Sequence, residues 1–252
     1  MGKIVAIGGG ENGREGYPYE TKEIDESIVR LTNKSNPNFL FIGLASGKFE
    51  ESYFNVMHKI YEKLGCKTDI LRLKELSNRK IVHEKISKAD IIYVGGGNTL
   101  KLMTLLRKYG IDKLLKEAYK EEKVLCGVSA GGICWSNYGN SDSRKFTSDS
   151  KQLIKVRGLG LIDILFCPHY NIEPHRQIDL ERMMKTTYKM PAIALENGVA
   201  LEIVDKKYRF IQSIPNSRAY KCFWKNNKYN KYELEISEKY KPLNDLYKKD
   251  PL

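Results

Sequence analysis

A strand that runs directly into a helix is predicted by the stretch Lys123-Val124-Leu125-Cys126-Gly127-Val128-Ser129-Ala130-Gly131-Gly132-Ile133-Cys134-Trp135. Its first six residues form a short apolar run typical of a buried strand, and the residues from Ala130 onward open a helix. The same alternation recurs towards the N-terminus, with predicted strands at 3–7, 38–44, 69–73 and 90–94 and predicted helices at 20–31, 52–64, from 99 and at 111–119. Strands buried on both faces that alternate with helices indicate an α/β three-layer sandwich with a mostly parallel sheet.

The second half of the chain has a different pattern. Residues 140–152 are polar, and we expect them to form a surface excursion. Further predicted elements are strands at 162–167 and 192–195, a helix at 176–188, a hairpin at 199–204 and 208–211, and antiparallel strands at 219–224 and 231–234. We therefore expect a parallel core with an antiparallel C-terminal edge. One domain is expected over residues 1–252, with a basic C-terminal extension from about residue 236.

The composition suits a packed globular protein. Of the 252 residues, 41% are hydrophobic and 29% are charged, which argues against a largely disordered chain. No apolar run approaches the ~18 residues needed to span a bilayer, so an integral membrane protein is excluded. The apolar residues before Gly8 are too few for a secretory signal, and we expect a cytoplasmic protein. The five cysteines form no C-x-x-C pair and no zinc-ligand spacing, so we expect buried, reduced thiols and no metal site.

The net charge raises the question of nucleic-acid binding. Lys and Arg number 43 against 31 Asp and Glu, giving a formal charge of +12. Most lysines are spread along the chain, and only the C-terminal tail is dense in lysines with tyrosines between them. A solvated lysine-rich surface is the interpretation we favour over stacking on a single strand, so nucleic acid is not the expected partner. A non-catalytic binding module that uses this tail is the alternative from a different functional class.

A nucleophilic serine, Ser129, is predicted directly after the strand at 123–128. Ligands bind such sheets at the carboxyl ends of the strands, where this chain has glycine-rich or small-residue loops. Gly127-Val128-Ser129-Ala130-Gly131 is a G-x-S-x-G pattern between strand and helix, which is typical of a nucleophile elbow. The tight turn exposes the Ser129 hydroxyl, small neighbours avoid clashes, and the helix N-terminus supplies N–H groups for an oxyanion.

Ser129 requires a general base, and the chain has only four histidines. His169 directly follows an apolar run, where a strand would deliver its side chain to the active edge. His58 and His83 lie in helix-like segments, and His175 lies in a polar helix start. The sequence therefore favours His169 as the base.

The acid that would orient the imidazole is predicted at Glu196, which ends the apolar run 192–195. The order Ser129, His169, Glu196 fits an α/β-hydrolase poorly, because the histidine comes last in that fold; Asp142 or Asp163 would have to be its acid. A hydrolase with a cysteine nucleophile is a further hypothesis. Cys126 and Cys134 flank the elbow, however, and neither occupies its apex.

Four motifs give the chain a resemblance to a known family. It resembles the peptidase E family of serine peptidases, which includes aspartyl dipeptidase and cyanophycinase. The motifs occur in the family's order and are Tyr93-Val94-Gly95-Gly96-Gly97-Asn98-Thr99, Gly127-Val128-Ser129-Ala130-Gly131-Gly132, Cys167-Pro168-His169-Tyr170 and Ala194-Leu195-Glu196-Asn197-Gly198-Val199-Ala200-Leu201.

The resemblance implies a class I glutamine-amidotransferase-like fold with serine in place of that fold's usual cysteine. It implies Ser129 as nucleophile, His169 as general base and acid, and Glu196 as its partner. Backbone N–H groups of Gly97 and Ala130 would form the oxyanion hole, and Asn98 would lie at the substrate pocket. No metal or organic cofactor is implied.

The implied activity is that of a serine peptidase acting on small, aspartyl-containing peptides. A cyanophycinase-like hydrolase of β-aspartyl peptides is the alternative, because the spacings from Ser129 to His169 and from His169 to Glu196 look closer to that branch. A cation near His169, such as Arg176, could bind an aspartyl carboxylate bidentately. We expect a small peptide as partner, no membrane, and a monomer or homodimer.

Overall fold

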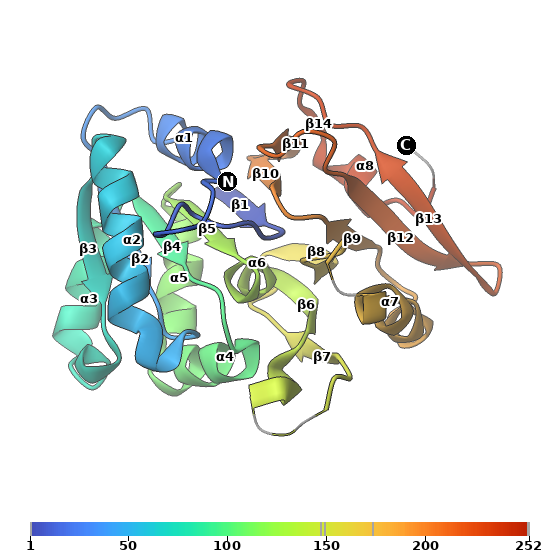
Figure 1. Ribbon diagram of the computed structural model, residues 1–252, viewed down its shortest axis with the longest axis horizontal. Helices are drawn as coiled ribbons and strands as arrows, with labels where there is room; N and C mark the ends of the chain where they lie inside the picture. The colour runs from blue at the N-terminus through green and yellow to red at the C-terminus, as the bar shows by residue number, and fades with distance from the viewer. Residues whose placement is uncertain (1, 147, 149, 173, 251–252) are drawn as a thin grey trace.

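Two β-sheets with helices around them make up the fold (Figure 1). The computed structural model describes residues 2–146, 148, 150–172 and 174–250. The larger sheet has the strand order β14-β11-β10-β1-β5-β4-β2-β3. Its strands are β1 Lys3–Ile7, β2 Asn38–Ile42, β3 Lys67–Leu71, β4 Ile91–Val94, β5 Val124–Val128, β10 Val199–Val204, β11 Lys207–Gln212 and β14 Lys241–Pro242.

The centre of the larger sheet is parallel, from β1 through β5, β4 and β2 to β3. All residues of β4 and β5 are buried, as their continuous apolar sequences predict. The register pairs Ile7 with Val128 and Val94 with Gly127, so β1, β5 and β4 end at the same edge. The predicted mostly parallel α/β sheet is confirmed, and the loops that follow these strands meet at one edge.

Helices cover both faces of the larger sheet, which gives three layers. On one face, Ile24 and Ile28 of α1 and Met57 and Tyr61 of α2 belong to one hydrophobic cluster. On the other face, α3, α4 and α5 pack against the alternate strand residues. The helices are α1 Lys22–Arg30, α2 Glu50–Lys63, α3 Arg79–Lys88, α4 Thr99–Lys108, α5 Ile111–Lys120, α6 Ala130–Trp135, α7 Pro174–Thr186 and α8 Leu243–Tyr247. No helix within the described residues is long and apolar enough to cross a membrane.

The antiparallel edge predicted for the C-terminal half is also present. Strand β10 pairs antiparallel with both β1 and β11, and Asp205 turns the hairpin with a φ of 55°. The basic C-terminal residues fold onto this edge, where β14 pairs with β11. Leu243 and Leu246 of α8 are buried in the main hydrophobic cluster.

The second sheet was not expected from the sequence. Its order is β13-β12-β9-β8-β6-β7, with β6 Ser136–Ser141, β7 Ile154–Arg157, β8 Ile162–Cys167, β9 Ala192–Leu195, β12 Ala219–Lys225 and β13 Lys228–Leu234. Strands β8 and β9 are parallel, so the residues that follow them meet at one end of this sheet. The predicted antiparallel strands 219–224 and 231–234 therefore belong to a separate sheet rather than to the edge of the first.

The polar segment 140–152 is only partly a surface excursion, so that expectation is wrong for its first residues. Asn140 and Ser141 lie in β6, and both are buried, as is Ser143 in the short 3-10 helix Ser143–Phe146. Their side chains are paired inside the protein: the Ser141 hydroxyl lies 2.9 Å from that of Thr99. Hydrogen bonding within the fold outweighs the polarity of these residues. Residues 147 and 149 lie outside the described residues.

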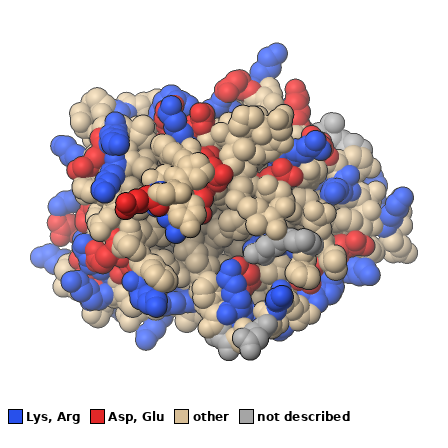
Figure 2. All heavy atoms as spheres, in the orientation of Figure 1, with Lys and Arg blue, Asp and Glu red and all other residues tan. Residues whose placement is uncertain are grey.

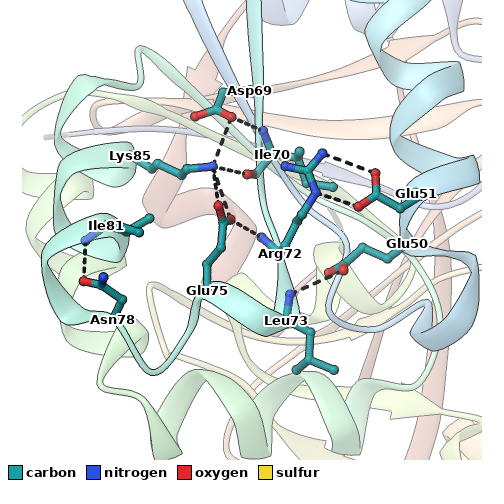
Figure 3. A network of polar contacts seen from close by, with 10 residues as sticks. All are labelled: Glu50, Glu51, Asp69, Ile70, Arg72, Leu73, Glu75, Asn78, Ile81 and Lys85. Carbon is teal, nitrogen blue, oxygen red and sulfur yellow. Dashed lines mark hydrogen bonds and ion pairs between the residues drawn. The ribbon is translucent and has the colours of Figure 1, made fainter.

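A network of charged side chains closes the outer edge of the larger sheet at β3 (Figure 3). Lys85 of α3 donates to the Ile70 carbonyl and pairs with Asp69 and Glu75. Arg72 binds Glu51 of α2 through two nitrogens, at 2.6 and 3.3 Å. The network thus joins α2, β3 and α3 through side chains that are half-buried, such as Lys85 and Glu75, or exposed, such as Glu51 and Asp69.

Candidate active site

Ser129 occupies the sharp turn between β5 and α6. Its backbone has φ 55° and ψ −108°, a conformation that residues with a Cβ rarely adopt. The Ser129 N–H donates to the carbonyl of Ile7 at 3.0 Å, which ties the turn to the end of β1. The side chain is half-buried. This is the strained turn that the G-x-S-x-G pattern predicts.

The glycines on either side of Ser129 permit close backbone contacts. A Cβ on Gly131 would overlap the carbonyl oxygen of Val94, and a Cβ on Gly127 would lie 2.6 Å from that same oxygen. The elbow therefore packs backbone to backbone against the end of β4. This packing brings the glycine loop after β4 beside the serine, where a Cβ on Gly96 would lie 3.6 Å from the Ser129 Cβ.

Most N–H groups of that glycine loop already have a partner. Gly95 and Asn98 donate to main-chain carbonyls at the end of β2 and in the loop after it, both at 3.0 Å. The backbone of Gly96 is hydrogen-bonded to the hydroxyl of Tyr53. For the Gly97 N–H no acceptor is found among the described residues. Gly97 is thus the loop residue whose N–H group is left for a ligand, as an oxyanion hole requires.

The second predicted oxyanion donor, Ala130, is the first residue of α6. The first N–H groups of a helix have no acceptor within it. The Ser129 N–H is already used by Ile7, so the next N–H along the chain is that of Ala130. Two loops, after β4 and after β5, therefore flank the serine with backbone donors.

His169 follows β8 and also has a left-handed backbone, with φ 53°. Its N–H donates to the carbonyl of Gly8 at 2.9 Å. Ser129 and His169 are therefore bound to adjacent carbonyls, those of Ile7 and Gly8, at the end of β1. This shared anchor brings a residue of the second sheet to the catalytic edge of the first.

The imidazole of His169 is oriented by an amide. Its Nδ1 lies 2.8 Å from Oδ1 of Asn197, in the turn after β9. Because an amide oxygen can only accept, this contact assigns the proton to Nδ1, so that Nε2 is the acceptor nitrogen of the ring. Gly9 covers this pair: a Cβ at that position would overlap both Asn197 Oδ1 and the His169 ring.

Comparisons with known proteins show the family of the chain. The model of peptidase family S51 matches residues 4–211. The chain belongs to peptidase family S51. It is 30% identical over 224 residues to the uncharacterized peptidase YgaJ of Bacillus subtilis, covering 88% of this chain and 92% of YgaJ. It is 29% identical over 172 residues to a peptidase E of a Nostoc species, covering 64% of this chain and 66% of that protein.

A solved structure supports the fold. The crystal structure of a peptidase from an acI-B1 actinobacterium superposes with a TM-score of 0.71 at 18% identity, covering 96% of this chain and 97% of that one. The resemblance to the peptidase E family is thereby confirmed, and family membership identifies the chain as a peptidase.

Within this S51 chain, Glu196 does not take the place expected of it. Its carboxylate accepts hydrogen bonds from the Arg218 N–H at 3.0 Å and from the Tyr220 hydroxyl at 3.2 Å, both of β12 or its approach. The neighbouring Asn197 lies against His169 instead. The physical reason is that β9 pairs with β12, which draws the residue at the strand end towards that partner.

Arg176 is buried rather than open to substrate, with 1% of its surface exposed. Its Nη1 donates to the Asn140 carbonyl at 3.0 Å, and its Nη2 lies 3.6 Å from the Asp142 carboxylate. The first turn of α7 thus packs onto the end of β6. A guanidinium held in this way is fixed in direction.

Asn98 caps α4, as the sequence predicts. Its Oδ1 accepts from the Lys101 N–H at 3.0 Å, and its side chain is half-buried beside the glycine loop. One end of the amide is therefore used by the helix. The cap does not use the amide nitrogen.

Alternative nucleophiles and bases are poorly placed. All five cysteines are free and buried, and burial raises the pKa of the Cys126 and Cys134 thiols well above the usual value. His58 Nδ1 is bonded to the Thr68 hydroxyl at 2.6 Å, away from the elbow. Among the described residues no three His, Cys, Asp or Glu side chains group as metal ligands would.

Sequence reasoning missed Asn197, Gly9 and Tyr53. Asn197 directly follows Glu196, the residue that the sequence favours, and Asn197-Gly198 is a turn signal in the sequence. The sequence places the glycine loop after β1, which contains Gly9, at the edge of the sheet. The contact of Gly9 with the imidazole depends on the register of β1 with β10. Nothing in the local sequence of α2 distinguishes Tyr53 from a core residue.

Proposed function

We propose that this S51 peptidase is a serine peptidase with Ser129 as its nucleophile. The observation that carries the proposal is the shared anchor at the end of β1. A strained serine and a histidine with a defined tautomer are fixed there to adjacent carbonyls. Nucleophile and base must be held in a fixed relation for acyl transfer, and this anchoring supplies such a relation.

In the proposed reaction, Ser129 Oγ attacks the scissile carbonyl and His169 Nε2 accepts its proton. The N–H groups of Gly97 and Ala130 stabilise the oxyanion. Collapse of the intermediate breaks the C–N bond, and the imidazolium gives its proton to the leaving amine. A water molecule, activated by the same imidazole, then hydrolyses the ester and regenerates the serine.

Asn197 gives the triad a neutral third member. It holds the ring direction and the tautomer but adds no negative charge beside the imidazolium. Glu196, proposed from the sequence for this role, acts one step further away by fixing the strand end that carries Asn197. Catalysis then depends on orientation more than on charge stabilisation at Nδ1.

We propose aspartyl-containing peptides as substrates, with β-aspartyl peptides as the alternative. The resemblance to the peptidase E family supports this choice, whereas Arg176, the cation that the sequence indicated, is buried and bound to Asn140 and Asp142. The amide nitrogen of Asn98 would contribute to substrate binding beside the glycine loop. Five free thiols support a reducing, cytoplasmic compartment.

The test is hydrolysis of Asp-Leu, β-Asp-Arg, Ala-Leu and glutamine by the wild type and by Ser129→Ala. Loss of on the order of 10⁶ in rate is expected for the variant. A fluorophosphonate label found on Ser129 by peptide mapping would show a reactive hydroxyl independently of substrate choice. Unchanged hydrolysis by Ser129→Ala would overturn the proposal.

A further inference from the structure

A groove runs beside the catalytic edge, between the loop after β1 and helix α2. Its volume is about 550 Å³, within the ~300–1,000 Å³ usual for ligand pockets. We call it the α2 groove. It is lined on one side by Gly10, Glu11, Asn12, Arg14 and Glu15 and on the other by Phe49, Ser52, Tyr53 and Val56. In Figure 1 the loop is the dark blue segment near α2, and Figure 2 shows the same face hollowed near its centre.

The α2 groove lies next to the proposed oxyanion loop, with Tyr53 between them. Tyr53 forms part of its wall, and the hydroxyl of Tyr53 is hydrogen-bonded to the backbone of Gly96. Gly96 in turn lies beside Ser129, since a Cβ on Gly96 would be 3.6 Å from the Ser129 Cβ. One side chain therefore separates the groove from the residues that would hold the reacting carbonyl.

The loop wall of the groove is held in place by its own hydrogen bonds. Glu11 and Glu20 exchange two bonds, both 2.7 Å, and Gly13 donates to Pro18 at 2.9 Å. The Asn12 side chain reaches across to the Met57 sulfur of α2 at 3.4 Å. A wall fixed in this way is preorganised for binding.

A second cavity extends the α2 groove away from Ser129. It has a volume of about 380 Å³ and continues along α2 past Lys59, Ile60 and Lys63. The two cavities share Asn12, Arg14, Glu15 and Val56. An extended chain advances ~3.3 Å per residue, so a path along several turns of α2 has room for more residues than a dipeptide has.

The α2 groove is acidic in a basic protein. Its lining has two carboxylates, Glu11 and Glu15, and one cation, Arg14. Arg14 is bound to both Glu11 oxygens, at 2.9 and 3.2 Å, so the carboxylate of Glu15 supplies the net charge. This acidic lining is confined to the α2 groove: the whole chain has a formal charge of +12, the second cavity adds Lys22, Lys59 and Lys63, and Lys and Arg are scattered over the face in Figure 2.

We propose that the α2 groove binds an extended stretch of the peptide substrate that carries a basic side chain, so that the substrate is an oligopeptide rather than a dipeptide. The inference rests on the proposed function. The aliphatic stem of a lysine or arginine would pack on Phe49 and Val56, with its charged end at Glu15. Phe49 is 60% exposed, so its ring is open to contact with such a stem.

Binding is tested with the Ser129→Ala variant, which keeps the groove and cannot turn over its ligand. Fluorescein-labelled Asp-Leu is compared with Asp-Leu extended to hexapeptides that carry lysine or glutamate in the added positions. The lysine hexapeptide should bind at least about tenfold more tightly than the dipeptide. Equal affinity of hexapeptides and dipeptide would overturn the inference.

Two substitutions locate the binding. Val56→Trp fills the groove and should bring the lysine hexapeptide to dipeptide affinity, whereas Leu73→Trp, an exposed site near α3, should change nothing. Glu15→Lys should weaken binding of the lysine hexapeptide by about fivefold and strengthen binding of the glutamate hexapeptide. The control Glu117→Lys makes the same charge change on α5 and should alter neither affinity. Because Glu15 is exposed on a loop, its variant keeps the test valid if Val56→Trp fails to fold.

The two proposals fail separately. If the wild type hydrolyses Asp-Leu but peptide length and Glu15→Lys have no effect on binding, the groove proposal is wrong and the serine mechanism stands. If the lysine hexapeptide binds and both groove variants weaken it, the groove proposal stands even where fluorophosphonate leaves Ser129 unlabelled.

Discussion

The catalytic edge and the outer edge at β3 use polar groups in opposite ways. At β3, Lys85, Arg72 and their acidic partners form several ion pairs between side chains that are half-buried or exposed (Figure 3). At the proposed catalytic edge, Ser129 and His169 are held by backbone hydrogen bonds and close glycine contacts. Exposed ion pairs contribute little energy, whereas a misplaced backbone at a reacting centre costs a great deal. The number of charged side chains in a region is therefore a poor guide to how much a substitution there will cost.

The largest effect is expected from a single methyl group at the elbow. Gly131→Ala would drive a Cβ into the Val94 carbonyl, and we expect a loss of about 3 kcal/mol or more in unfolding free energy, together with the activity. Urea unfolding and peptide hydrolysis measure the two.

The matched control for that change is Gly96→Ala, whose Cβ would meet ordinary contacts no closer than 3.5 Å. It should leave the unfolding midpoint unchanged. A Gly131→Ala protein as stable and as active as the wild type would show that the elbow is not packed as described.

A second test concerns a buried carboxylate that links the loop after β1 to α2. Asp25 is fully buried and accepts from Thr21, Tyr19 and Tyr61, at 2.8, 3.1 and 2.7 Å. Burial raises its pKa from 3.8 to about 6, although these hydroxyls favour the charged form. The folded protein thus binds this proton more tightly than the unfolded chain does.

The sign of the resulting pH dependence follows from linkage. The contribution of Asp25 to stability is fully present below pH 4 and is lost as the pH rises through 6, by up to ~3 kcal/mol. Urea unfolding of the wild type and Asp25→Asn between pH 4 and pH 7.5 measures it. The difference between the two should change over this window, whereas Glu26→Gln on the same helix should run parallel to the wild type.

The third test separates Asn197 from Glu196. Asn197→Ala should lower kcat/KM by about 10²-fold, because the imidazole loses its orientation. Glu196→Gln keeps the hydrogen bonds to Arg218 and Tyr220 largely possible and should cost much less.

Asn197→Asp adds a sharper readout. A carboxylate at that position would raise the pKa of the imidazole relative to the wild type, so the acid limb of the kcat/KM profile should move to higher pH by about one unit. An unmoved limb, or a larger loss in Glu196→Gln than in Asn197→Ala, would return the orienting role to Glu196.

The smallest effect is expected at the outer edge. Lys85→Met removes contacts with Asp69, Glu75 and the Ile70 carbonyl, yet we expect a loss of only about 1 kcal/mol in unfolding free energy, with activity unchanged. Lys88→Met, which removes an exposed pair with Glu84, should leave the unfolding midpoint where it was. If Lys85→Met lost as much unfolding free energy as Gly131→Ala, the outer edge would be as sensitive to substitution as the elbow, contrary to this comparison.

The sequence by itself determined the parallel core and the elbow. These features are local: a buried strand, a turn of small residues and a helix start lie within thirteen residues, and the steric demands at Gly127 and Gly131 follow from that turn. The Asn98 cap and the glycine loop after β4 are local in the same sense. Periodicity and turn chemistry are sufficient for such elements.

Only the tertiary structure decided which side chains meet. The choice of Asn197 over Glu196 depends on β9 pairing with β12, and the burial of Arg176 depends on α7 packing against β6. The α2 groove depends on a loop after β1 lying along a helix some forty residues later. The physical reason is that neighbouring side chains at a strand end or in a loop point in opposite directions. Only pairing with segments far away in the sequence decides which of the two faces the site.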